Sequence, residues 1–282
     1  MSGTAIKNCI CPNNSDSISN IGRPRIVWAI PAIHGQLEPL QKLHDYILEQ
    51  IRPGDRVVYH GNYTGYSADS AACISEILTF RRMVLSLEGM MPSDIQYLRG
   101  RQELIWQKLF QLHYAPNPTD VLLWMLGNGL SETLYSYNLC PHEGIEACKY
   151  GTLGITKWTG LIRKAIRAHA GHDVFMCQLK RAAFTDTNNS APMLFVHAGL
   201  NPQQSLHDQG DHFWWACESF QNMDLAYKPF EKVIRGYDPE HKGSHLNCVT
   251  ATIDDGCGFG GNLVGVAFDE NADVSMVLEA TH

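Results

Sequence analysis

Three stretches built in the same way decide the fold we predict: RIVWAIPAIHG (25–35), RVVYHGNYTGYS (56–67) and IQYLRGRQE (95–103). Each begins with a β-branched or aromatic run suited to a buried strand and ends in a short polar loop that contains glycine. Helical spacing separates them, so the pattern indicates a mostly parallel sheet covered by helices. Loops at the carboxyl ends of such strands meet at one edge, and we expect three to converge: 33–36, 60–67 and 99–103.

The rest of the chain adds helices and a second set of strands. Apolar residues at spacings of three and four predict helices over 40–51 and Ala68–Leu87. Residues 104–190 are mostly helical in pattern, with an inward stripe over Ile155–Ala170 that includes Trp158 and Leu161. Its other side is predicted to be a solvated face, formed by Lys157, Arg163, Lys164 and Arg167. Five further strands are predicted near 193–196, 231–235, 248–253, 262–268 and 273–278.

Composition bounds the class of protein. The 282 residues are 44% apolar and 18% charged, which predicts one folded domain over 24–280 after a flexible segment, 1–23. The net charge of −7 offers no basic field for nucleic acid or an anionic membrane. No apolar run is long enough to span a bilayer, so we expect a soluble, cytoplasmic protein. Nine cysteines without a framework spacing predict reduced thiols, and Cys9 and Cys11 are interpreted as thiols in a tail rather than metal ligands.

Seven segments, in order, carry a resemblance to a known family. They are IHGQLEPLQKLHDYI, VVYHGNYTGYS, YLRGRQE, LLWMLGNGLSETLYSY, LFVHAGLNP, VIRGYDP and IDDGCGFGGNL. This series resembles the signature segments of calcineurin-like metallophosphoesterases, in the bacterial branch of the phosphoprotein (Ser/Thr) phosphatases. The resemblance implies a four-layer α/β/β/α sandwich. It also implies a pair of divalent metals, Mn or Fe/Zn, which would clamp a phosphate and generate a hydroxide.

The chain departs from nearly all the family's metal ligands. Family ligand positions survive only as His34 and His197, and Asn62 stands where the bridging Asp belongs. Ligands are lost at Ala32, Arg101 and Tyr237. Because Asn62 is neutral and the Arg101 guanidinium stays protonated in proteins, we expect no metal and no other cofactor.

The catalytic groups are replaced too. The Asp that orients the catalytic His is Gly65, the general-acid His is Gln102 and the phosphate-binding Arg is Tyr66, while Cys217 stands where bacterial members have a further Arg. An amide cannot protonate a leaving alkoxide. Arg99 and Glu103 remain from the family pattern. These substitutions predict no catalytic residues and therefore a pseudophosphatase.

Several readings stay open around the loops. Arg99, Arg101, His34 and His197 could form a phosphate-binding but non-hydrolysing pocket, or Arg99 could pair with Glu103 while Arg101 points to solvent. His60 could join a zinc site, although a strand His more often packs with a hydrogen-bonded neighbour, and a replacement ligand could come from His241 or His245. Asp254 and Asp255 are interpreted as turn-forming rather than catalytic residues, and Trp214 and Trp215 as core residues rather than a binding platform.

Three classes of function follow. The first is an inactive phosphatase-like module that binds and regulates a protein partner, which could be phosphorylated. The second is a metal-dependent phosphoesterase with a remodelled site around His34, Asn62 and His197. The third is a structural subunit of a larger complex. The enzyme requires bound metal and turnover, whereas the binding module requires neither.

Overall fold

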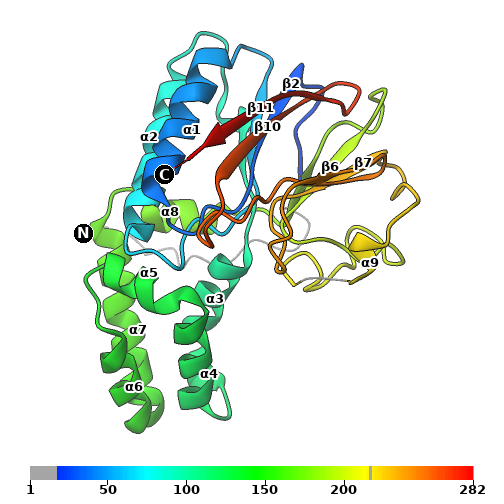
Figure 1. Ribbon diagram of the computed structural model, residues 1–282. Helices are drawn as coiled ribbons and strands as arrows, with labels where there is room; N and C mark the ends of the chain where they lie inside the picture. Colours follow the sequence, from blue (N-terminus) through cyan, green and yellow to red (C-terminus); the bar gives the residue numbers. More distant parts are fainter. Residues whose placement is uncertain (1–17, 216–217, 282) are drawn as a thin grey trace, which may run out of the picture.

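The computed structural model describes residues 18–215 and 218–281, and in that part of the chain two sheets lie face to face (Figure 1). The first sheet has the strand order β11-β10-β2-β3-β4, and the second has the order β1-β5-β6-β7-β9-β8. In the first sheet β2, β3 and β4 run parallel, in the register Ala29 to Val58 and Val58 to Gln96. The predicted α/β class and the parallel core of the sheet are therefore confirmed.

The strand bounds agree closely with the sequence patterns for the longer runs. Sheet one contains β2 (Ile26–Ile30), β3 (Arg56–Tyr59), β4 (Ile95–Tyr97), β10 (Leu263–Asp269) and β11 (Val274–Ala280). Sheet two contains β1 (Ile18–Asn20), β5 (Ala182–Phe184), β6 (Met193–Val196), β7 (Lys232–Arg235), β8 (His245–Leu246) and β9 (Thr250–Thr252). The strands that no pattern predicted, β1, β5 and β8, have only two or three residues each.

The helices fall into a layer on the first sheet and a projecting arm. The layer consists of α1 (Leu37–Gln50), α2 (Ser70–Leu85) and α8 (His172–Cys177). The arm consists of α3 (Arg101–Leu109), α4 (Pro118–Met125), α5 (Ser131–Ser136), α6 (Pro141–Lys149) and α7 (Gly151–Ala168). A π-helical turn at Leu126–Leu130 joins α4 to α5. Figure 1 shows the arm extending away from the sheets, with α6 and α7 at its far end. The predicted helical segment thus runs over 101–177.

Separate apolar clusters hold the layers together. One fills the space between the sheets, with Val27, Val58, Phe195 and Ile234 among its members. A second joins the outer face of the first sheet to α1, α2 and α8, and a third forms the interior of the arm. Burying apolar side chains in this way supplies the main driving force for folding.

The fourth layer differs from the expected sandwich. The outer face of the second sheet is covered mainly by the chain between Leu200 and Phe230, which packs Phe213, Trp214 and Phe220 onto the strands. The one helix of this layer among the described residues, α9 (Glu218–Gln221), has four residues. Aromatic side chains on loops therefore bury the sheet face where the fold class led us to expect helices.

The N-terminal boundary also differs. The sequence predicts a flexible segment that includes residues 18–23, but β1 pairs in parallel with β5, and Ile21 is buried between the sheets. The folded part therefore begins at least six residues before the predicted start at residue 24. Cys9, Cys11 and the rest of residues 1–17 lie outside the described residues. Within residues 18–215 and 218–281 no helix has the length and apolarity that a membrane crossing requires.

Candidate functional site

The three loops that follow β2, β3 and β4 meet as predicted. The backbone N–H of His34 donates to the Asn62 carbonyl oxygen at 2.8 Å, which joins the first loop to the second. The second loop presses on the third, because a Cβ at Gly61 would lie 2.3 Å from the Gly100 nitrogen. Gly61 also has a φ of +91°, which disfavours other residues. His34 and Asn62 themselves have φ values of 51° and 54°, so this edge of the sheet is built from strained, tightly held backbone.

Glu103 holds the second and third loops together from inside. Its buried carboxylate accepts the backbone N–H groups of Asn62, Tyr63 and Gly100, each at 2.9 Å. Burial raises the pKa of Glu103, and these hydrogen bonds oppose the rise. None of these hydrogen bonds involves Arg99. Glu103 therefore fixes the backbone of the loops rather than neutralising the charge of an arginine.

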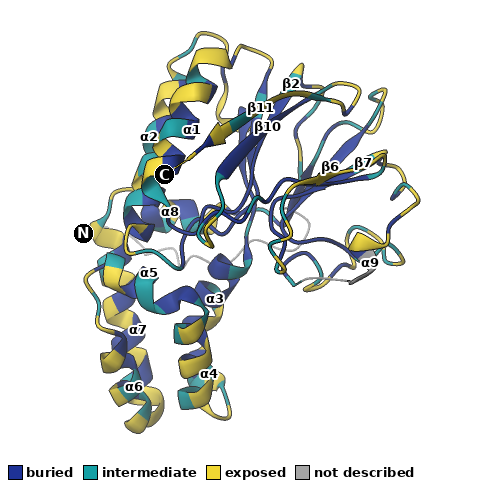
Figure 2. Cartoon of the chain, viewed as in Figure 1, coloured by how far each residue is buried: buried dark blue, intermediate teal, exposed yellow. Residues whose placement is uncertain are grey.

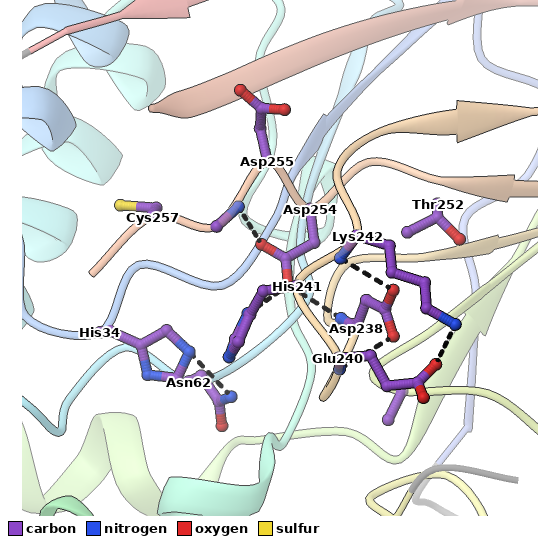
Figure 3. A network of polar contacts seen from close by, with 12 residues as sticks. His34, Asn62, Asp238, Glu240, His241, Lys242, Thr252, Asp254, Asp255 and Cys257 are labelled. Carbon is purple, nitrogen blue, oxygen red and sulfur yellow. Dashed lines mark hydrogen bonds and ion pairs between the residues drawn. The ribbon is translucent and has the colours of Figure 1, made fainter. Parts of the chain in front are cut away.

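Asp254 also holds backbone at the site by accepting N–H groups (Figure 3). Its buried carboxylate accepts the N–H of Asp238 at 2.8 Å and that of Gly256 at 3.0 Å. These bonds confirm the turn-forming interpretation of Asp254. Asp255 is less buried, and the Ser244 hydroxyl lies 3.4 Å from its carboxylate.

Two of the positions where the resemblance implies metal ligands form an apolar contact. Ala32 and Tyr237 pack together with Ala198, and all three are buried. The Tyr237 ring stacks on His197, with centroids 5.1 Å apart and an angle of 11° between the planes. Burial raises the pKa of the Tyr237 hydroxyl, although the nearby Arg101 charge opposes the rise. The phenol ring therefore occupies space beside Ala32 that a carboxylate would need.

His197 is fully engaged by the protein backbone. Its Nδ1 donates to the His60 carbonyl oxygen at 2.5 Å, which leaves the lone pair on Nε2. That lone pair accepts the backbone N–H of Arg101 at 3.1 Å. Burial lowers the pKa of His197 to about 3, so the ring is neutral at ordinary pH. The nitrogen that could bind a metal is thus already used by α3.

His34 and Asn62 lie side by side, as Figure 3 shows. The Asn62 amide nitrogen is 3.4 Å from His34 Nε2, and the Asn62 amide oxygen accepts the N–H of Gln102 at 2.9 Å. Burial, followed by His197, His241 and Arg101, lowers the pKa of His34 well below its usual value. Its Nδ1 has no hydrogen-bond partner among the described residues. His34 is instead surrounded by aromatic rings, those of Tyr66, Tyr237 and Phe259.

Arg101 reaches toward the arm and is held there. Its guanidinium donates to the Asn128 side-chain oxygen at 2.6 Å and lies 4.9 Å from the Trp215 ring centroid and 6.0 Å from that of Trp124. Cation–π contacts of this kind favour a charged group over an aromatic face. The buried Nε of Arg101 has no hydrogen-bond partner among the described residues. Sequence reasoning missed Trp124 and Asn128, although both stand in the segment LLWMLGNGL that carried the resemblance.

Gln102 and Gly65 depend on each other. A Cβ at Gly65 would lie 2.7 Å from Gln102 Cδ, so the Gln102 side chain fills the space beside that glycine. Gln102 Nε2 donates to the Asn128 carbonyl oxygen at 2.9 Å. Since Gly65 has a φ of +99°, an Asp at this position would be strained as well as crowded. The amide at 102 therefore links the site loop to the arm.

The other candidate residues are dispersed. The Arg99 guanidinium lies 5.9 Å from the Trp214 ring, and Trp214 is a core residue as predicted. His60 packs at 5.9 Å from Phe195, with Nδ1 3.1 Å from the Ile30 carbonyl oxygen, so the packed interpretation is confirmed. His245 is exposed on β8.

His241 is the one replacement candidate that reaches the site. Its ring stacks on Phe259 at 3.9 Å, and its Nδ1 lies 3.7 Å from the Asp254 carboxylate (Figure 3). Tyr237 contacts it from the other side at 5.8 Å. Trp215, expected in the core, is only partly buried and faces Arg101. Cys217 lies outside the described residues.

These donors do not fit a pair of divalent cations. Such ions prefer carboxylates that offset their charge, and the carboxylates that meet at these loops, Glu103 and Asp254, are bonded to backbone N–H groups. The Asn62 amide oxygen and His197 Nε2 are bonded too, and a permanent cation lies alongside. In the part of the chain that the structure describes, no group of three or more His, Cys, Asp or Glu side chains is placed to hold a metal.

Comparisons with solved structures define the fold class. A putative diadenosine tetraphosphatase aligns with a TM-score of 0.54 at 15% identity, over 94% of this chain and 99% of that one. A protein serine/threonine phosphatase from Saccharomyces cerevisiae with similarity to human phosphatase PP5 aligns with a TM-score of 0.51 at 12% identity, over 94% and 84%. No protein-family model and no curated protein sequence matches the chain.

The chain therefore has the calcineurin-like metallophosphoesterase fold. The loops at 33–36, 60–67 and 99–103 lie together at the carboxyl ends of β2, β3 and β4. At these identities the structural likeness extends to the fold alone.

Proposed function

We propose that this protein is a pseudophosphatase: a phosphatase-like module that binds a phosphorylated protein partner at Arg101 and does not hydrolyse it. The observation that carries the proposal is the state of the Arg101 side chain. Its charge is permanent, yet no carboxylate among the described residues pairs with it, and its Nε lacks an acceptor. A buried donor left without a partner costs about 1–3 kcal/mol, which an incoming oxyanion would relieve.

The surroundings of Arg101 suit a phosphate group. The planar guanidinium matches phosphate oxygens in a two-pronged hydrogen bond, and Trp124 and Trp215 hold it in one orientation. Burial lowers the pKa of both His34 and His197, so these neutral rings add no charge and Arg101 is the charged anchor. Arg99 adds a second positive charge to the same loop, and the N-terminus of α3 adds its dipole.

The same residues argue against hydrolysis. Gln102 stands at the general-acid position, and its amide is bonded to Asn128 rather than directed at a leaving group. His197 Nε2 is bonded to the Arg101 N–H, and Tyr237 packs beside Ala32. The proposal therefore includes neither a metal nor a hydroxide, and the partner would leave with its phosphate intact.

Tryptophan fluorescence offers a direct test, because Trp124 and Trp215 flank Arg101. Full-length protein is titrated with inorganic phosphate and with a phosphoserine peptide beside its unphosphorylated form. We expect saturable binding of the phosphorylated ligands, weakened at least about tenfold in Arg101→Gln because one charge-assisted pair of about 1.5–3 kcal/mol is lost. Arg163→Gln is the matched control, since Arg163 also lies on an aromatic ring, 4.2 Å from that of Phe110, but in the arm.

Two outcomes would overturn the proposal. Equal affinity of wild type and Arg101→Gln for phosphate would show that Arg101 is not the anchor. Release of phosphate from the peptide above the rate in buffer would favour the remodelled metal-dependent enzyme.

A further inference from the structure

The end of the helical arm carries apolar side chains that the fold leaves uncovered. Tyr150 is 75% exposed, Leu153 66% and Leu161 52%, and all lie on the hairpin of α6 and α7. Leu161 was predicted to face the interior, so its exposure is a departure from the sequence pattern. Figure 2 shows the long exposed stretches of this hairpin at the far end of the molecule. Apolar residues gathered on one exposed face commonly mark an interaction surface.

These residues line a groove of about 600 Å³ between the two helices. The groove exists because small residues let the helices approach closely. A Cβ at Gly154 would lie 2.3 Å from the Ala147 carbonyl oxygen, and one at Gly144 would lie 2.4 Å from the Trp158 ring. Ala147, Gly154 and Trp158 lie along the groove, and larger side chains of α6 and α7 flank it.

The charges along the groove are arranged so that the surface complements itself. The α6 side carries Glu143 and also Glu146, which pairs with Lys149 of the same helix at 2.7 Å, and the α7 side carries Lys157. Lys157 has no ion-pair partner among the described residues, and neither has Glu143. A two-fold axis parallel to the helices would place α6 of one copy opposite α7 of the other. Each Lys157 would then face the acidic side of the second copy, at both ends of the symmetric contact.

We propose that this groove is the contact surface for a second copy of the same chain. In this arrangement Tyr150, Leu153 and Leu161 leave water, and the charges at the rim set the orientation of the two hairpins. An antiparallel arrangement with α6 facing α6 would bring the glutamates together and is disfavoured. Since the residues that line the groove include none of the three that contact Arg101 (Asn128, Trp124 and Trp215), this inference is independent of the phosphate-binding proposal.

The test is a charge exchange followed by sedimentation equilibrium of the full chain. Wild type should sediment as a dimer. Lys157→Glu and Glu143→Lys alone should each weaken the dimer at least about tenfold. The two-fold axis repeats the contact between residues 157 and 143, so each single variant places like charges opposite each other at both places. An equimolar mixture of the two variants should dimerise again, and so should the double variant, since opposite charges then face each other. Arg82→Glu, on the exposed side of α2, makes the same change in net charge as Lys157→Glu but away from the arm, and it should leave the dimer intact.

Two results would overturn this inference. Wild type could sediment as a monomer at every concentration at which it stays soluble. Alternatively, a dimer could persist unchanged in both single variants, which would place the contact elsewhere on the molecule. The substituted residues lie at the surface, so we expect each variant to fold. An unchanged circular dichroism spectrum and phosphate titration will show that a variant has lost the dimer contact and not its fold.

Discussion

Two sets of positions around the site differ in the side chains that they carry. Glu103 and Asp254 hold loops by accepting backbone N–H groups, and both carboxylates are present and fully bonded. The positions where the resemblance implies metal ligands, 32, 101 and 237, carry an alanine, an arginine and a tyrosine. The first set supports the loops, whereas the second set packs against neighbouring side chains.

The comparison shows that the protein's own groups bond the loops to one another. The interior carboxylates and the backbone hydrogen bonds between loops hold the strained residues His34 and Asn62 in place. Further contacts surround His197, because the Tyr237 ring stacks on it and the Arg101 N–H donates to its Nε2. Contacts among the protein's own side chains and backbone therefore fill the space around His197 and Tyr237.

We expect the largest change in stability when one of the carboxylates that support the loops is removed. Glu103→Ala leaves three buried N–H groups without acceptors, and we expect a loss of about 5 kcal/mol in the free energy of unfolding, measured by urea denaturation. Glu88→Ala is the exposed control, with an expected change within about 0.5 kcal/mol. A cost for Glu103→Ala as small as that of the control would contradict the supporting role.

Acid should act on the buried imidazoles next. Burial lowers the pKa of His197 to about 3 and that of His60 to about 4, from an ordinary value of 6.5. The unfolded chain therefore takes up protons first as the pH falls. The stability is present above about pH 6.5 and is lost toward the folded-state pKa values. Each group should cost about 2 kcal/mol by pH 5, or about 4 kcal/mol together.

The same urea titrations at pH 7.5 and pH 5 check this expectation. His60→Met removes one of the two groups and should reduce the loss on acidification by about 2 kcal/mol. A pH dependence identical to that of wild type would show that His60 is not held neutral in the folded state.

Asp254 and Asp255 sharpen the contrast between neighbours. Asp254→Ala removes the acceptor for two buried N–H groups and should cost about 3 kcal/mol, whereas Asp255→Ala should cost less than about 1 kcal/mol. Thermal unfolding of the pair of variants measures the difference. If the two costs are equal, the turn is held by its backbone alone.

Much of the fold was predictable because its long strands and helices carry clear periodicity. The strands Arg56–Tyr59 and Met193–Val196 lie where the apolar runs begin and end, within a residue. Short edge strands such as β1 have too few residues to show a period, and the aromatic loop over the second sheet has no helical spacing to read.

The positions of the candidate site could be predicted, but the contacts of their side chains could not. The residues at 32, 101 and 237 could be identified from the order of the segments alone. That Trp124, Trp215 and Asn128 would enclose Arg101 depends on how the arm packs against α3 and on chain segments far apart in the sequence. No local pattern encodes such a contact.

We infer that the protein's own groups occupy the place where the resemblance implies two metals. Its most direct test is the metal content of full-length protein by mass spectrometry after equilibration with Mn²⁺, run beside hydrolysis of an aryl phosphate. We predict well under one equivalent of metal and no turnover above buffer. About two equivalents of Mn²⁺, with turnover that His197→Ala abolishes, would contradict the account.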